Sequence, residues 1–259
     1  MLVLFALVAS IGAACAQQTP DTRVLDLVKA GKLRVGLFPP QSNKDPATGE
    51  FKSAWAEIAK ALAARIGVQL VLLEHPTPPK VVECLKTGAC DMVFLPFDDR
   101  AASVGDFSAP YMQFDYTLLV LTGSSVRSIA DADRTGVRIA AVRNHASTIT
   151  LSGMLKQAEL VYADTPDPTF DLLRAGSAEI MASTRPVLQE FSARLPGSRV
   201  LESHYGANVN RIVIPKGHAE RLAYINEFVE EAKASGLVQK AIDRGGPRGI
   251  TVAPAGESH

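Results

Sequence analysis

The sequence predicts an α/β fold with two lobes, and three observations support this prediction. Short apolar segments of strand length alternate with amphipathic segments of helical period along nearly the whole chain. The alternation starts afresh at Val137, which indicates a second α/β unit with its own sheet. Two helical segments close the chain and need an apolar surface to cover. Packing them back onto the first unit makes that lobe discontinuous in sequence.

The elements are expected in two successive series. In the first series the strands are 33–36, 70–73, 92–95 and 116–121, and the helices are 55–66 and 80–86. In the second series the strands are 137–142, 160–162 and 180–182, and the helices are 147–157, 169–175 and 186–195. A returning strand and two closing helices are expected at 210–214, 219–234 and 238–243. This order implies two sheets of parallel type.

The chain is expected to pass between the lobes twice, near 119–123 and near 208–213, and these segments are the candidate hinges. The predicted organisation is a signal peptide at 1–16, a discontinuous first lobe at 24–119 and 213–250, and a second lobe at 120–212. The tail after Gly249 is rich in Ala, Pro and Gly, and we expect it to fray.

The predicted signal peptide is MLVLFALVASIGAACA, which is apolar, uncharged, too short to span a bilayer and ends in small residues around Cys15. It favours export, so we expect a periplasmic protein. The segment lacks a positively charged start, which leaves open a start codon upstream or a shortened one at Met1. Lipid attachment at Cys15 is an alternative, although no Leu lies three residues before it.

The composition argues against several classes of protein. Lys and Arg number 27, as do Asp and Glu, so the formal net charge is zero, and nucleic acid is not an expected partner. After the leader, no segment is apolar enough to cross a membrane. The five histidines are dispersed along the sequence, so we expect no metal site and no cofactor.

Removal of the leader leaves two cysteines, Cys84 and Cys90, in an oxidising compartment. We expect a disulfide between them. Two unpaired core cysteines are the alternative, because spacing alone does not fix the Cα separation that a bridge needs. The C-x5-C spacing is not a redox motif, so no chemistry is assigned to the pair.

Four motifs in order carry a resemblance to a known family: VLDLVKAGKLRVG at 24–36, AEIAKALA at 56–63, CLKTGACD at 84–91 and DFSAPY at 106–111. The chain resembles the family 3 extracellular solute-binding proteins, the polar amino-acid binding group of ABC importers. The resemblance implies a fold of the type II periplasmic binding proteins, whose lobes close on a small-molecule ligand. It also implies a monomer that delivers its ligand to the membrane permease subunits and is not an enzyme.

In the first lobe, the family usually holds a ligand carboxylate with an Arg after the third strand, because a guanidinium is a planar two-pronged donor. Here Arg100 lies one position before the family position, which falls on Ala101. Either a local insertion restores the geometry or the contact has moved. A solvated Arg at a helix start is the alternative. The family also has Ser or Thr at two positions before this turn, and these positions are Pro and Phe in this chain.

In the second lobe, the family position for an acidic contact to a ligand ammonium falls on Thr184, which is neutral. The change favours a ligand with negative or little charge. Arg185 is then a second candidate anion contact, or a surface residue at a helix start. Asn144 and His145 lie in a turn before a helix, where backbone N–H groups favour an anion. His145 either contacts the ligand or is solvated.

Four aromatic residues are candidates for apolar walls of the site, although each could belong to the core instead: Phe38, Trp55, Phe97 and Tyr205.

Two other functions stay open. Some relatives on this fold are periplasmic enzymes of the cyclohexadienyl dehydratase type, but they use an acidic residue where this chain has TRPV at 184–187. The sequence also lacks a Ser/His/Asp order and a phosphate-binding glycine loop. A ligand-binding sensor module would present the same closed lobes to a receptor, so the sequence does not separate it from an importer component.

Overall fold

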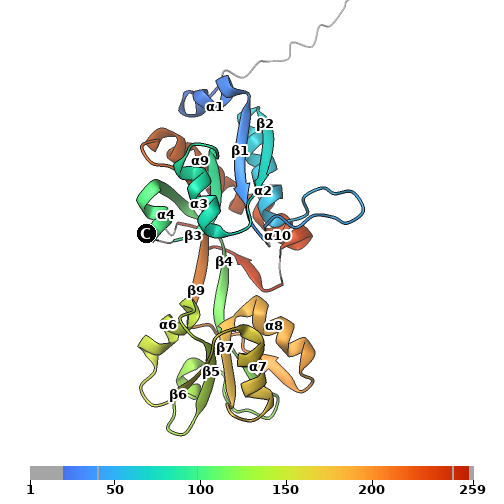
Figure 1. Cartoon of the computed structure of the whole chain (residues 1–259), viewed down its shortest axis with the longest axis vertical. Helices are drawn as coiled ribbons and strands as arrows, with labels where there is room; N and C mark the ends of the chain where they lie inside the picture. Colours follow the sequence, from blue (N-terminus) through green and yellow to red (C-terminus); the bar gives the residue numbers. More distant parts are fainter. Residues whose placement is uncertain (1–19, 40, 98, 247, 257–259) are drawn as a thin grey trace, which may run out of the picture.

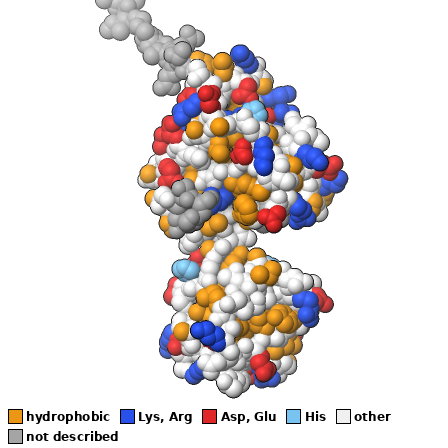
Figure 2. All heavy atoms as spheres, turned by 90° about the vertical axis from the view of Figure 1, so that its left-hand side faces the viewer, with side chains coloured by type: hydrophobic (Ala, Val, Ile, Leu, Met, Phe, Trp, Pro, Cys, Tyr) orange, Lys and Arg blue, Asp and Glu red, His pale blue; other side chains and the backbone are white. Residues whose placement is uncertain are grey.

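The computed structural model describes residues 20–39, 41–97, 99–246 and 248–256, which form an α/β molecule with two lobes lying end to end (Figure 1). The predicted signal peptide and Cys15 lie outside the described residues. Within the described ranges, no helix combines the length and apolarity needed to cross a bilayer. Figure 2 shows the molecule narrowing to a waist between the lobes.

The first lobe has a parallel sheet formed by β1 (Lys32–Leu37), β2 (Gln69–Glu74) and β3 (Met92–Pro96). Its helices are α1 (Leu25–Ala30), α2 (Ala54–Ile66), α3 (Pro78–Lys86), α4 (Asp99–Val104), α9 (Ala219–Ala234) and α10 (Leu237–Gly245), and a short 3-10 turn, η1 (Thr22–Val24), precedes them. Helix α2 begins where the Ser53 hydroxyl accepts the Ala56 N–H, and it ends at Gly67, whose φ is 80°. Helices α9 and α10 come from the end of the chain and pack on this lobe, as predicted.

The second lobe repeats the arrangement with β5 (Arg138–Val142), β6 (Glu159–Ala163) and β7 (Ile180–Thr184), which are also parallel. Its helices are α5 (Ile129–Ala132), α6 (Ala146–Met154), α7 (Pro166–Arg174) and α8 (Arg185–Arg194), and a short strand, β8 (Ser198–Val200), lies at its edge.

Two long strands, β4 (Gly105–Leu121) and β9 (Gly206–Pro215), connect the lobes. They pair in antiparallel fashion from Gly105 opposite Pro215 to Tyr116 opposite Gly206. Strand β9 also pairs with β3, while β4 pairs with β7, β8 and β10 (Ile250–Val252). The prediction of two separate sheets is therefore wrong, because β4 and β9 join the ten strands of the described residues into one sheet.

Each lobe has its own apolar core. On β4, Phe114 packs against the core of the first lobe, whereas Tyr116 belongs to the core of the second. On β9, Ile212 belongs to the first core. The core packing favours a boundary on β4 near residue 115, earlier than the expected boundary at 119 and 120. The lobe boundaries themselves stay a prediction.

The disulfide between Cys84 and Cys90 is present, with a Cα–Cα distance of 5.3 Å. It joins the last turn of α3 to the turn that leads into β3. Both cysteines are buried, and they contribute to a third apolar cluster with Val81, Leu85 and Leu95.

Candidate ligand-binding site

Most of the residues predicted to bind ligand lie at the carboxyl ends of strands in both lobes. Strands β1 and β3 end at Leu37 and Pro96 in the first lobe, and β5 and β7 end at Val142 and Thr184 in the second. Ligands of open α/β sheets generally bind beyond such strand ends. Helices α6 and α8 begin at the edge of the second lobe that faces the first lobe (Figure 1).

The first lobe contains a pocket of about 240 Å³ at the carboxyl ends of β1 and β3. Its lining residues come from the end of β1, the start of α3, the end of β3 and α4: Phe38, Pro78, Pro79, Val82, Leu95, Pro96 and Arg100. Three of these residues are prolines, which have no N–H to donate. Arg100 is the only charged residue among the described residues that line the pocket. The pocket thus combines apolar walls with one guanidinium group.

Two of the predicted aromatic walls lie outside this pocket. Phe97 follows β3, is 64% exposed, and has its ring centroid 5.3 Å from that of Phe107. Trp55 is 2% exposed and packs in the core of the first lobe. Their ligand contacts stay predictions, and the burial of Trp55 favours its alternative assignment to the core.

In the second lobe, Asn144 and His145 form the turn that starts α6. Asn144 has a φ of 56°, the left-handed conformation that Asn adopts more readily than most residues. The side chain of His145 caps α6, because its Nδ1 accepts the Ser147 N–H at 3.3 Å and lies 2.8 Å from the Ser147 Oγ. Partial burial lowers the pKa of His145. One N–H at this helix end is therefore already occupied by a neutral imidazole.

Tyr205 lies beneath the start of α6 and belongs to the core of the second lobe. Its ring centroid is 6.0 Å from that of Tyr116, and its buried hydroxyl makes no hydrogen bond of good geometry with the described residues. Burial raises the pKa of Tyr205, and the nearby Ser147 side chain opposes that rise. Tyr205 can contact a ligand only through a small exposed fraction of 8%.

Thr184 and Arg185 follow β7 and have different surroundings. Thr184 lines a second pocket, of about 620 Å³, together with Phe114 and Arg248. Arg185 is 8% exposed and donates from Nε to Asp115 at 3.2 Å, and from its two terminal nitrogens to the Leu201 and Glu202 carbonyls at 2.8 and 2.9 Å. The expected alternative, a surface arginine, does not fit this burial. Arg185 instead connects strand β4 to the second lobe.

Sequence reasoning missed two parts of this arrangement. Pro78, Pro79 and Val82 line the first pocket, and only the Pro-Pro pair at the start of a helix could have indicated this. Asp115, the partner of Arg185, lies 70 positions away in sequence, and no local pattern connects the two residues.

The two lobes are joined by two strands, and candidate ligand residues lie at the strand ends of both lobes. This arrangement is that of a two-lobed solute-binding protein. The chain belongs to the bacterial extracellular solute-binding proteins, family 3, which match residues 34–244. This result confirms the family that the sequence motifs indicate.

Known proteins with similar sequence or structure support the same fold. The chain is 22% identical, over 74% of its length and 72% of the relative, to the ABC transporter glutamine-binding protein GlnH of Bacillus subtilis (strain 168). It superimposes with a TM-score of 0.65 and 25% identity on an ancestral cationic amino acid solute-binding protein, covering 85% of this chain and 97% of the other.

Two further solved structures are similar in fold. The L-arginine-bound substrate-binding protein AbpA of Streptococcus pneumoniae has a TM-score of 0.57 at 20% identity, with 85% of this chain and 96% of that chain covered. An ancestral cyclohexadienyl dehydratase has a TM-score of 0.62 at 23% identity, with 87% and 97% covered.

Proposed function

We propose that this chain is the periplasmic substrate-binding component of an ABC importer and captures a small organic or aromatic acid by closure of its two lobes. Membership of family 3 and similarity to a glutamine-binding protein of an ABC transporter support the transport role. The partners would be a small-molecule ligand and the membrane permease subunits, and the protein would act as a monomer.

The pocket of the first lobe carries the proposal for the ligand class. Its walls are apolar, and its one charged lining residue among those described is Arg100. A guanidinium favours a carboxylate, while the apolar walls favour a ring or a branched hydrocarbon. At about 240 Å³ the pocket is smaller than the roughly 300–1,000 Å³ typical of sites for drug-sized ligands, so the ligand is small.

The second lobe supports the same ligand class because it has no acidic side chain at position 184. Thr184 stands where the family resemblance places an acidic partner for a ligand ammonium, and a hydroxyl does not neutralise a positive charge. Arg185 is buried and bonded to Asp115 and two carbonyls, whereas Arg100 lines the pocket of the first lobe, so the anion contact is assigned to Arg100. A cationic amino acid would bring a charge of the same sign toward the guanidinium of Arg100.

Strands β4 and β9 would act as the hinge of this closure. The ligand would first contact the pocket of the first lobe, and bending of the two strands would bring the α6 end of the second lobe onto it. The ligand shifts this equilibrium only by its greater affinity for the closed state.

A thermal-shift screen tests the ligand class, because a ligand that binds only the folded state raises the Tm by mass action. We expect benzoate or another small aromatic acid to raise the Tm more than L-arginine or L-lysine does. Arg100→Ala should remove most of this shift, whereas Arg134→Ala, which removes an exposed arginine of the second lobe, should leave it unchanged. A best hit among cationic amino acids would contradict the proposed ligand class.

A dehydratase activity is the alternative, because an ancestral cyclohexadienyl dehydratase has a similar fold. Incubation of the protein with a cyclic dienyl acid separates the two functions, because a binding protein returns its ligand unchanged. Co-purification with permease subunits, in place of a receptor, separates transport from sensing.

A further inference from the structure

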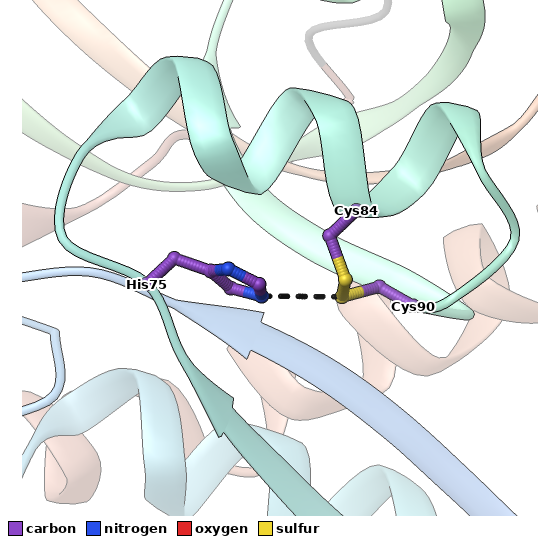
Figure 3. Close-up of side chains that lie close together, drawn as sticks. All are labelled: His75, Cys84 and Cys90. Carbon is purple, nitrogen blue, oxygen red and sulfur yellow. Dashed lines mark hydrogen bonds between the residues drawn. A yellow bond between two sulfur atoms is a disulfide. The ribbon is translucent and has the colours of Figure 1, made fainter.

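A cluster of three potential metal ligands lies in the first lobe, outside the site described above (Figure 3). His75 follows β2, Cys84 is in the last turn of α3, and Cys90 precedes β3. The Nε2 of His75 lies 3.9 Å from the Sγ of Cys90, and the ligand atoms of all three residues lie within 4.8 Å of one another. No local spacing indicates this cluster, because His75 lies nine positions before Cys84.

We infer that His75, Cys84 and Cys90 form a redox-dependent site for Zn²⁺, which is closed while the disulfide is intact and becomes available when it is reduced. In the disulfide the sulfur atoms are not thiolates, and thiolates are the sulfur ligands of zinc. A dithiol would supply two electrons and two protons, so that one S–S bond breaks in the protein and another forms in the dithiol. Zn²⁺ would then displace both thiol protons.

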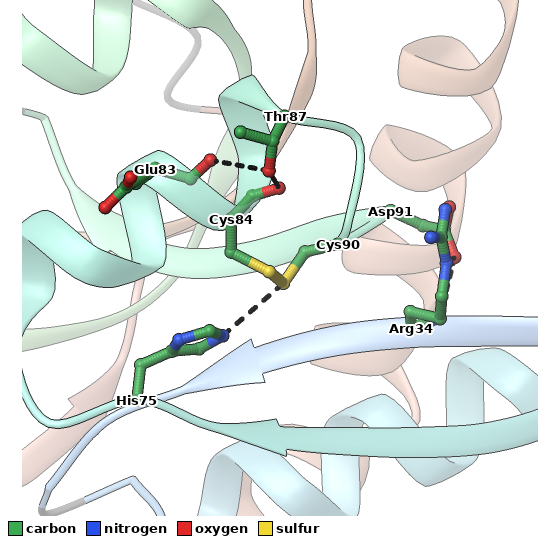
Figure 4. The surroundings of a disulfide bond; sticks show 7 residues. All are labelled: Arg34, His75, Glu83, Cys84, Thr87, Cys90 and Asp91. Carbon is green, nitrogen blue, oxygen red and sulfur yellow. Dashed lines mark hydrogen bonds and ion pairs between the residues drawn. A yellow bond between two sulfur atoms is a disulfide. The ribbon is translucent and has the colours of Figure 1, made fainter.

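The backbone around the cysteines is held by hydrogen bonds that do not depend on the disulfide (Figure 4). The Cys84 carbonyl accepts the N–H groups of Ala89 and Cys90 at 3.0 and 3.1 Å. The Thr87 hydroxyl is 3.0 Å from the Glu83 carbonyl and 3.2 Å from that of Cys84. Breaking the S–S bond should therefore leave the two sulfur atoms close together.

The neighbouring strands fix the other two sides of the cluster. Asp91, directly after Cys90, forms an ion pair with Arg34 of β1 at 2.6 Å and also accepts the Arg34 backbone N–H at 2.8 Å. The backbone N–H of His75 donates to the Leu37 carbonyl at 2.8 Å. His75 and Cys90 are thus held beside β1 in advance, and Cys84 is tied to the turn before β3 through its carbonyl, which lowers the ordering cost of a metal site.

The chemistry of the donors favours Zn²⁺ over harder ions. Two thiolates and one imidazole are typical zinc ligands, and hard cations such as Mg²⁺ and Ca²⁺ prefer oxygen. The charge of two thiolates would be balanced by Zn²⁺, which suits the apolar cluster around the cysteines. His75 is half-buried and gives access from solvent, so water can fill the fourth position.

The test uses the whole chain treated with a phosphine reductant, which breaks the disulfide without adding a competing thiol and is itself oxidised to the phosphine oxide. Co²⁺ serves as the spectroscopic probe, and Zn²⁺ is then added to displace it. We expect one Co²⁺ per reduced chain with thiolate-to-cobalt charge-transfer absorption, and none for the oxidised chain. Cys90→Ser should abolish this absorption.

The His75 contact has its own control. His75→Ala should weaken Zn²⁺ binding about tenfold or more, by analogy with the 10–100-fold losses seen when the support of a metal site is removed. His204→Ala, which removes an exposed imidazole of the second lobe, should have no effect. Equal binding by the His75→Ala variant and the original chain would overturn the assignment of His75.

Circular dichroism measures the Tm of the reduced chain, which shows whether reduction destabilises the fold. Should reduction lower the Tm, Zn²⁺ must restore it in the original chain and not in Cys90→Ser. Reduced protein that takes up no more Zn²⁺ than oxidised protein, with no recovery of Tm, would overturn the proposal. The test needs no ligand between the lobes, so its failure and a failure of the proposed function are distinguishable.

Discussion

Replacement of Arg185 by Met tests whether this residue stabilises the passage between the lobes or binds ligand. The guanidinium donates to the Asp115 carboxylate and to two backbone carbonyls, at 2.8–3.2 Å. The side chains of Arg185 and Asp115 are each 10% exposed. Met keeps the apolar length of the side chain and removes the guanidinium, with its donors and its positive charge.

The expected loss of stability is large because the substitution leaves a buried charge without its partner. Asp115 would keep the side-chain amide of Gln113 at 3.2 Å, and two carbonyls would lose a donor. Removal of one partner from a buried ion pair typically costs about 3–5 kcal/mol. In the double variant Arg185→Met with Asp115→Asn, the uncompensated charge is absent, so part of this loss should be recovered.

Urea denaturation followed by far-UV circular dichroism measures these free energies of unfolding. Fluorescence of Trp55, which is buried in the first lobe, shows whether that lobe unfolds in the same transition. Arg174→Met is the matched control, because the ion pair of Arg174 with Asp171 is 56% and 66% exposed and should contribute less than about 1 kcal/mol. If Arg185→Met lowered stability no more than the control and abolished ligand binding, Arg185 would be a ligand contact and our reasoning would be wrong.

Three further predictions concern single features of the structure. Replacing both Cys84 and Cys90 with Ser should lower the free energy of unfolding by about 2 kcal/mol, from the loop-entropy model for a short closed loop; an unchanged urea midpoint would contradict this. His145 has a lowered pKa in the folded state, so the unfolded chain binds more protons below pH 6.5 and stability should fall as the pH drops through that range. His145→Asn, which can still cap α6, should flatten this part of the pH profile of urea midpoints; an equally steep profile would exclude His145 as the cause. Asn144→Val should destabilise by about 1–2 kcal/mol, because a β-branched residue is strained at a φ of 56°, while Asn144→Gly should not, and equal urea midpoints for the two variants would refute this.

The regular elements could be predicted because their burial follows local periodicity. The predicted helix 219–234 coincides with α9 (Ala219–Ala234), and strand β1 differs from its prediction by one residue at each end. Strand β4 begins eleven positions before the predicted strand 116–121. It contains Pro110 and irregular pairing between Phe107 and Met112, and these interrupt the alternation by which a strand is recognised.

The candidate site could be predicted only where contacts are local. Asn144 and His145 form the turn before a helix that the sequence predicts, since this turn is determined by neighbouring residues. The burial of Arg185 depends on Asp115, and the contact of His75 with Cys90 depends on the pairing of β1 with both β2 and β3. Such contacts join distant parts of the sequence, so neither residue type nor spacing reveals them.

The discontinuity of the first lobe has a consequence for the order in which the molecule assembles. Its core contains Val24 and Trp55 near one end of the chain and Ile212, Phe228 and Ile250 near the other. This core cannot close until the final helices are in place, whereas the core of the second lobe is built from one uninterrupted stretch. The second lobe can therefore fold first, and the first lobe is completed last.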